Sequence, residues 1–91
     1  MISFDIGTLE QSIDIQQRVG TNDAFRDAVS DILLRYVRGD WGDAPYGICE
    51  VNDRHAAEGG AIAALYILPD GTNILVETNA SHDKTTMRVM E

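Results

Sequence analysis

The chain has little cysteine, few basic residues and no long apolar run. Cys49 is the one cysteine among 91 residues, so neither an internal disulfide nor a cysteine-based zinc site can form within one chain. Seven basic residues stand against fifteen acidic ones, which gives a net charge of −8. Nucleic acid and anionic membranes are bound mainly through Lys and Arg, so we expect neither as a partner. With no apolar run near ~20 residues and no signal-peptide pattern at the start, we expect a cytoplasmic protein.

What is present is typical of a small folded protein. Apolar residues make up 44% of the chain and charged residues 24%, a balance that argues against disorder. No linker, repeat or low-complexity segment divides the sequence. We therefore predict one domain over residues 1–91.

The amino-terminal part alternates between apolar and polar residues in two places. Ile2, Phe4 and Ile6 form the first alternation, and Ile13 and Ile15 lie in the second. A period of two predicts half-buried strands, so we expect two strands here. A helical turn over residues 9–13 is the alternative.

A long helix is predicted after this segment. Thr21 or Asn22 can cap its first amides, and Gly39 can supply its left-handed end. Between them the apolar side chains recur every three or four residues, the pattern of a helix with one buried face. They are Phe25, Val29, Ile32, Leu33, Tyr36 and Val37.

In the second half of the chain, the residue pattern predicts a short helix and three strands. Helical spacing runs from Ile48 to Glu58, and Gly59-Gly60 ends it. Residues 61–68 are apolar on both faces, which is typical of a central strand. A Pro-Asp-Gly-Thr turn and strands over 73–78 and 85–90 complete the chain. We predict an α+β two-layer fold of order β-β-α-α-β-β-β, with an antiparallel sheet packed by one long and one short helix.

The stretch Gly39-Asp40-Trp41-Gly42-Asp43 joins the two halves and contains the only tryptophan. Tryptophan is favoured as an interface anchor, so this corner is a candidate partner-binding site. The alternative, which we favour, is that Trp41 closes the core while the two aspartates cap backbone amides.

With these residues in view, the chain resembles a family of small proteins from bacterial plasmids, phages and integrated elements, often labelled plasmid-related. The resemblance covers roughly residues 13 to 90. It implies a mobile-element setting and no established activity. The chain departs from the family pattern just after the corner, at residues 44–49, and at Leu75. The matching positions are Gly39 to Asp43, Asn52-Asp53, Glu58-Gly59-Gly60, Tyr66, Asp70-Gly71-Thr72, Ile74 to Thr78 and Thr85-Thr86.

The sequence contains only weak indications of metal binding or catalysis. His55 and Glu58 lie three residues apart and are metal candidates, but their spacing matches no specific site. Cys49 with His55 or His82 is a conceivable thiol–imidazole pair, yet no complete set of nucleophile, base and orienting group can be named. We expect neither an enzyme nor a cofactor.

The acidic residues are the remaining lead. Asp40, Trp41, Asp43, Glu50 and Asp53 are the partner-binding candidates, and a solvated acidic face is the alternative. We expect a non-enzymatic interaction module of a mobile element, which inhibits a host defence system by occupying a basic surface of a protein partner. The alternative is a small-molecule or metal-binding domain that uses a cleft beside His55, Glu58 and Tyr66. A homo-oligomer formed through an exposed strand is a third possibility.

Overall fold

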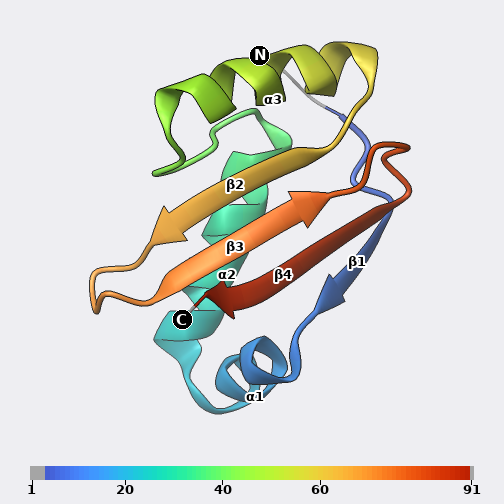
Figure 1. Ribbon diagram of the computed structural model, residues 1–91. Helices are drawn as coiled ribbons and strands as arrows, with labels where there is room; N and C mark the ends of the chain where they lie inside the picture. The colour runs from blue at the N-terminus through green and yellow to red at the C-terminus, as the bar shows by residue number, and fades with distance from the viewer. Residues whose placement is uncertain (1–3, 91) are drawn as a thin grey trace.

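The computed structural model describes residues 4–90 and confirms the α+β class. The sheet has four strands. In Figure 1, helix α2 lies behind the sheet and α3 runs along one side of it. No helix in this part of the chain is long and apolar enough to cross a membrane. The elements in chain order are β1 (Thr8–Gln11), α1 (Ile13–Thr21), α2 (Asp23–Val37), α3 (Tyr46–Glu58), β2 (Ile62–Ile67), β3 (Asn73–Thr78) and β4 (Lys84–Met90).

The sheet is mixed, so the prediction of a fully antiparallel sheet is wrong. Its strand order is β1-β4-β3-β2. The last three strands form the predicted antiparallel meander, whereas β1 runs parallel to β4. β1 can take this place because three helices lie between it and the meander, which gives the chain length enough to return in the same direction.

The prediction of a strand around Ile13 and Ile15 is wrong, because this segment begins α1. The Ser12 hydroxyl accepts a hydrogen bond from the Ile15 amide at 3.3 Å, which caps the helix. Ile15 is fully buried while Ile13 is 71% exposed, so the two isoleucines do not share a face. The single strand on this side is β1. Residues 4–7 form no strand, and Ile2 lies outside the described residues.

Helix α2 is confirmed with its predicted ends. The Asn22 side chain accepts a hydrogen bond from the Phe25 amide at 3.0 Å, and Gly39 has the left-handed φ of +84° expected after the helix. Its buried side chains Phe25, Val29, Ile32 and Tyr36 face the sheet as part of the core.

A chain of hydroxyl groups crosses this core. The Tyr36 hydroxyl lies 2.7 Å from that of Thr78, which lies 2.7 Å from that of Thr85, and Thr85 donates to the Ile6 carbonyl at 2.7 Å. Each hydroxyl can donate one proton, so the proton of Thr85 fixes the direction of the whole chain. The buried polar atoms of helix, sheet and amino-terminal segment are satisfied together in this way.

Strand β2 is an edge strand, so its predicted central position is wrong. Within residues 4–90 its one neighbouring strand is β3, and the corner and α3 lie along its other side. The corner supplies two hydrogen bonds: the Asp43 amide donates to the Leu65 carbonyl at 2.7 Å, and the Asp43 carboxylate accepts from the Ile67 amide at 2.9 Å. The edge is thereby closed to further strands, and the apolar composition of β2 reflects this cover.

Candidate functional site

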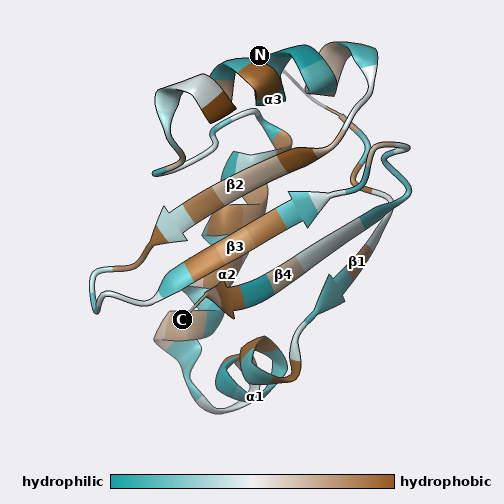
Figure 2. Cartoon of the chain, in the orientation of Figure 1, coloured by the Kyte–Doolittle hydropathy of each residue, from teal (hydrophilic) through white to brown (hydrophobic). Residues whose placement is uncertain are grey.

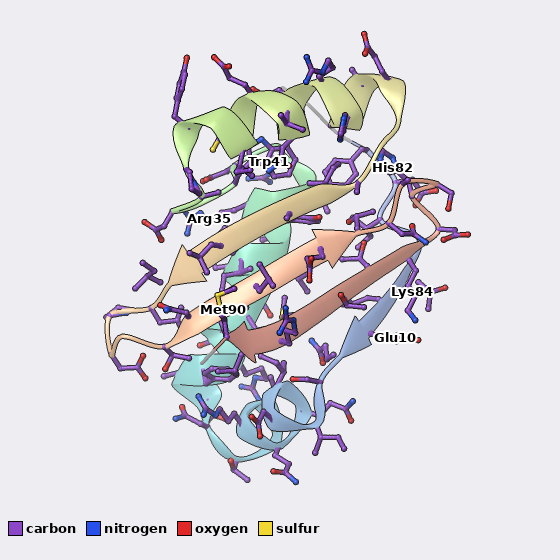
Figure 3. All side chains as sticks on the ribbon, viewed as in Figure 1. Glu10, Arg35, Trp41, His82, Lys84 and Met90 are labelled. Atoms are coloured by element: carbon purple, nitrogen blue, oxygen red, sulfur yellow. The ribbon has the colours of Figure 1, made fainter. Side chains whose placement is uncertain are left out.

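Trp41 is 4% exposed and lies in the core, which favours the structural interpretation over a surface anchor. Its ring lies edge-on to Tyr36, with 5.5 Å between the ring centroids, and tilted against Phe4 at 5.7 Å. Figure 3 shows Trp41 between α3 and β2. Its indole N–H donates to the Asp53 carboxylate at 2.9 Å, so the corner is fastened to α3 through this ring.

Asp40 caps the corner, as the structural interpretation predicts. Its carboxylate accepts a hydrogen bond from the Gly42 amide at 3.0 Å and forms an ion pair with Arg35 at 2.8 Å. The Arg35 hydrogen bond and then the Gly42 amide hold the pKa of Asp40 below its usual value. Since its charge is already paired within the chain, Asp40 is the least available of the acidic candidates.

Gly42 lets the corner approach the sheet closely. A Cβ at this position would collide with the Leu65 carbonyl and with the Tyr66 ring, and the φ of +67° also suits glycine. The same Tyr66 side chain donates from its hydroxyl to the Asp40 carbonyl at 2.6 Å. These contacts hold the corner tightly against β2.

Asp43 and Asp53 are exposed, yet neither side chain is free to rotate without losing a bond. Asp43 is held by the Ile67 amide and Asp53 by the indole of Trp41, each at 2.9 Å. Glu50, one turn before Asp53 on α3, is also exposed. We call Asp43, Glu50 and Asp53 the corner–α3 carboxylates. Residues 39–58 hold five acidic side chains against Arg54 alone, not counting histidine.

Both histidines use one ring nitrogen for a hydrogen bond within the chain. The His55 ring donates from Nδ1 to the Ala61 carbonyl at 2.7 Å, and His82 donates from Nε2 to the Gly60 carbonyl at 2.8 Å. Within residues 4–90, no three His, Cys, Asp or Glu side chains are grouped so as to hold a metal ion. Cys49 donates to the Ala44 carbonyl at 3.4 Å, and no hydrogen bond between described residues joins it to either histidine.

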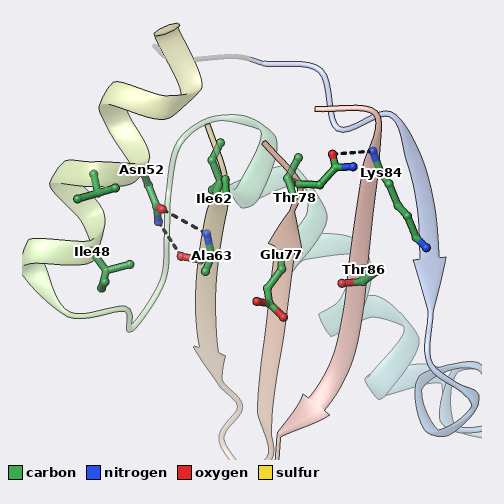
Figure 4. Close-up of a pocket in the computed structure, with 11 residues that line it drawn as sticks. Ile48, Asn52, Ile62, Ala63, Glu77, Thr78, Lys84 and Thr86 are labelled. Atoms are coloured by element: carbon green, nitrogen blue, oxygen red, sulfur yellow. Dashed lines mark hydrogen bonds between the residues drawn. The ribbon is translucent and has the colours of Figure 1, made fainter. Parts of the chain in front are cut away.

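A groove of about 530 Å³ does lie between α3 and the sheet, as Figure 4 shows. Its walls include Ile48 and Val51 on α3 and Glu77, Lys84 and Thr86 on the strands. His55, Glu58 and Tyr66, which the sequence placed beside such a cleft, do not line it. Tyr66 is buried on the other face of the sheet, so the cleft exists with different residues.

Asn52 has a structural role in this region that the sequence did not predict. It is 2% exposed, donates to the Ala63 carbonyl at 2.7 Å and accepts from the Ala63 amide at 3.2 Å. Figure 4 shows both bonds. Its position within an apolar helical repeat indicates a buried side chain, and a buried amide group requires hydrogen-bond partners.

Comparison with family models, with curated proteins and with solved structures finds no match to this chain.

The Arg35–Asp40 pair predicts a pH dependence of stability. Because the folded pKa of Asp40 lies below its ordinary value of 3.8, the pair stabilises the protein above about pH 4 and this contribution is lost as the pH falls further. Both side chains are substantially exposed, so we expect Asp40→Asn to cost less than about 1 kcal/mol at pH 7. In urea unfolding from pH 7 to pH 3, the difference in the free energy of unfolding between the parent chain and Asp40→Asn should shrink. A difference that stays constant would show that the ion pair does not cause it.

Proposed function

We propose that this chain is a small acidic, non-enzymatic interaction module of a mobile genetic element, acting in the cytoplasm. It inhibits a host defence system by occupying a basic surface of one of that system's proteins. The mobile-element part of the proposal is supported by the resemblance carried by the Gly39–Asp43 corner and the turn at residues 70–72. The interaction part is supported by the corner–α3 carboxylates.

The single observation that carries the proposal is that Asp43 and Asp53 are exposed and already fixed in place. A side chain fixed before binding loses little rotamer entropy on association. Each carboxylate has further lone pairs that can accept from Arg or Lys of a partner. Opposite charge on the partner speeds the encounter and selects against acidic surfaces.

The test compares two triple variants that remove the same charge. Asp43→Asn, Glu50→Gln and Asp53→Asn neutralise the corner–α3 carboxylates, and the new amide oxygens can still accept from Ile67 and Trp41. The control variant neutralises the exposed Asp14, Asp27 and Asp31 on α1 and α2. A partner is captured from host lysate with the parent chain, purified, and titrated with all three proteins at two salt concentrations.

We expect the corner–α3 variant to bind about tenfold or more weakly with a smaller salt dependence, and the control to change less than about twofold. Undiminished affinity of the corner–α3 variant would refute the acidic-surface mechanism. Equal losses in both variants would show that net charge acts without a defined site, which also refutes it.

A small-molecule site is the second candidate, favoured by the size of the α3–sheet groove. Its volume of about 530 Å³ falls within the usual range for ligand pockets. Native mass spectrometry of the freshly purified chain decides between the two. A stoichiometric added mass that is lost when Ile48→Asp places a charge on the apolar wall of the groove would favour the ligand, whereas the bare chain mass counts against it.

A further inference from the structure

The groove between α3 and the sheet is apolar on the side of α3. Ile48 and Val51 form its helical wall, and Ala61 and Ala63, at the start of β2, lie along its floor. Because an alanine side chain is a single methyl group, a hollow remains here between α3 and β3. Figure 2 shows hydrophobic residues on α3 and β2, whereas the end of β3 and the start of β4 are hydrophilic. The apolar part of a ligand therefore fits against α3 and β2.

The other side of the groove is polar and carries one charge of each sign. Glu77, Thr86 and Lys84 line it. The strand register sets Thr86 between Glu77 on β3 and Glu10 on β1. The Lys84 ammonium group lies 3.1 Å from the Glu10 carboxylate, which places it on the β1 side of Thr86. Figure 4 shows Thr86 between Glu77 and Lys84, so a hydroxyl group separates the two charges.

Both charges have bonding capacity left for a ligand. Arg88 lies 3.8 Å from the Glu77 carboxylate, a longer contact than a charge-assisted hydrogen bond of about 2.7–2.9 Å. A carboxylate can accept several hydrogen bonds, and the Lys84 ammonium group donates three, of which Glu10 takes one. Glu77 and Lys84 are also exposed, so their pairs within the chain are weak. A ligand cation can therefore bind Glu77, and a ligand anion Lys84, while each keeps its present partner.

The spacing of these groups sets the size of the ligand. Glu77 and Glu10 flank Thr86 at two strand spacings, roughly 9–10 Å between their Cα atoms. Two charge-assisted contacts of about 2.8 Å, together with an ammonium and a carboxylate group on one carbon atom, span a similar length. On the other side of Thr86, Ala63 is again roughly 10 Å away. A benzyl-sized side chain reaches from the charged head to Ala63, and a methyl group does not.

We propose that the α3–sheet groove binds a free α-amino acid with a large apolar side chain, such as phenylalanine or leucine. The ammonium group of the ligand donates to Glu77, and its carboxylate accepts from Lys84 and Thr86. Its side chain packs against Ile48 and Ala63. This inference rests on the second candidate function, the small-molecule site, and gives that site a class of ligand. It does not depend on the corner–α3 carboxylates.

Titration of the whole chain with L-phenylalanine, followed by NMR of the backbone amides, tests the proposal. We expect saturable shifts at Ala63, Glu77 and Thr86, with a dissociation constant on the order of 0.1–1 mM because the ion pairs are exposed to water. L-Phenylalaninamide and N-acetyl-L-phenylalanine each lack one charge and represent the two ends of a peptide. Both should bind about tenfold or more weakly, and so should L-alanine, which lacks the apolar side chain.

Two outcomes of this titration would overturn the proposal. One is the absence of saturable binding of both L-phenylalanine and L-leucine up to about 10 mM. The other is equal affinity for the free amino acid, its amide and its N-acetyl form, because the groove would then recognise the apolar ring alone.

Glu77→Gln and Lys84→Gln each remove one charge at nearly constant side-chain size. Each should weaken the binding of L-phenylalanine about fivefold or more, whereas Asp31→Asn, an exposed position on α2 outside the groove, should change it less than about twofold. Glu77→Gln should not weaken the binding of N-acetyl-L-phenylalanine, which has no ammonium group. Lys84→Gln should likewise not affect L-phenylalaninamide, which has no carboxylate. Unchanged affinity for L-phenylalanine in both groove variants would contradict the assigned contacts.

The corner–α3 triple variant should bind L-phenylalanine as the parent chain does, because none of its three changed residues lines the groove. Loss of the protein partner in that variant and loss of the amino acid in Glu77→Gln are therefore separate results. If native mass spectrometry instead finds a ligand of another class in the groove, the small-molecule site stands and the assignment of an amino acid is wrong.

Discussion

Trp41→Ala is expected to lower the free energy of unfolding by about 3–5 kcal/mol, the usual cost of truncating a large buried aromatic side chain. Trp41 is 4% exposed and packs against both Tyr36 and Phe4. The substitution also deprives Asp53 of its hydrogen-bond donor. A small domain has a free energy of unfolding at the low end of about 5–15 kcal/mol, so this substitution should remove most of the stability of the fold.

Trp41→Phe separates packing from hydrogen bonding. It keeps an aromatic ring in the core and removes the N–H group, so we expect a loss of about 1–2 kcal/mol. Urea unfolding followed by far-ultraviolet circular dichroism measures all three proteins, since tryptophan fluorescence is absent from both variants. If Trp41→Ala cost less than about 1 kcal/mol, the ring would not be a main support of this core.

The parts of the fold that the sequence predicted well are those where one local pattern decides the outcome. Helix α2 combines an Asn22 cap, one apolar face and a glycine end, and all three agree with its tertiary packing. The β2–β3 turn has a similarly complete set of signals in residues 69–72. The strand predicted over residues 73–78 is confirmed as β3, in which Ile74 and Val76 are buried.

The errors arose where a short pattern was outweighed by other contacts, which are local in the case of α1 and tertiary in the case of β2. Ile13 and Ile15 alternate over too few residues to distinguish a strand from the first turn of a helix, and the cap at Ser12 decided it. β2 was placed centrally because both of its faces are apolar. The backbone partners on its outer side are Asp43 and Asn52, which lie outside the strand, 24 and 11 residues before the residues they bond, so no local pattern in β2 predicts them.

The residues of the candidate site could be predicted from the sequence, but their contacts could not. The sequence identified the carboxylates around the corner, but not that Asp40 pairs with Arg35 while Asp43 and Asp53 are each held by a single donor. These differences depend on β2 and α3 meeting at the corner. They make Asp43 and Asp53 better candidates for a partner than Asp40.

Asn52→Ala is expected to cost about 2–4 kcal/mol, because the substitution removes the partners of both the amide and the carbonyl of Ala63. Leaving a buried donor or acceptor unsatisfied costs more than the net gain of one hydrogen bond. The better helix propensity of alanine offsets only about 0.5 kcal/mol. Arg54→Ala, at an exposed position on the same helix, is the matched control and should change stability by no more than about 0.5 kcal/mol.

Asn52→Asp tests the same contact through pH. The ionised side chain can still accept from the Ala63 amide, but it turns a second oxygen, with no proton, toward the Ala63 carbonyl. Protonation restores a donor, so the loss relative to the parent chain should be smaller at pH 4 than at pH 7. Urea unfolding at the two pH values measures this difference. Equal losses at both would show that Asn52 fills space at the β2 edge without pairing its backbone, and the closure of that edge would then rest on Asp43 alone.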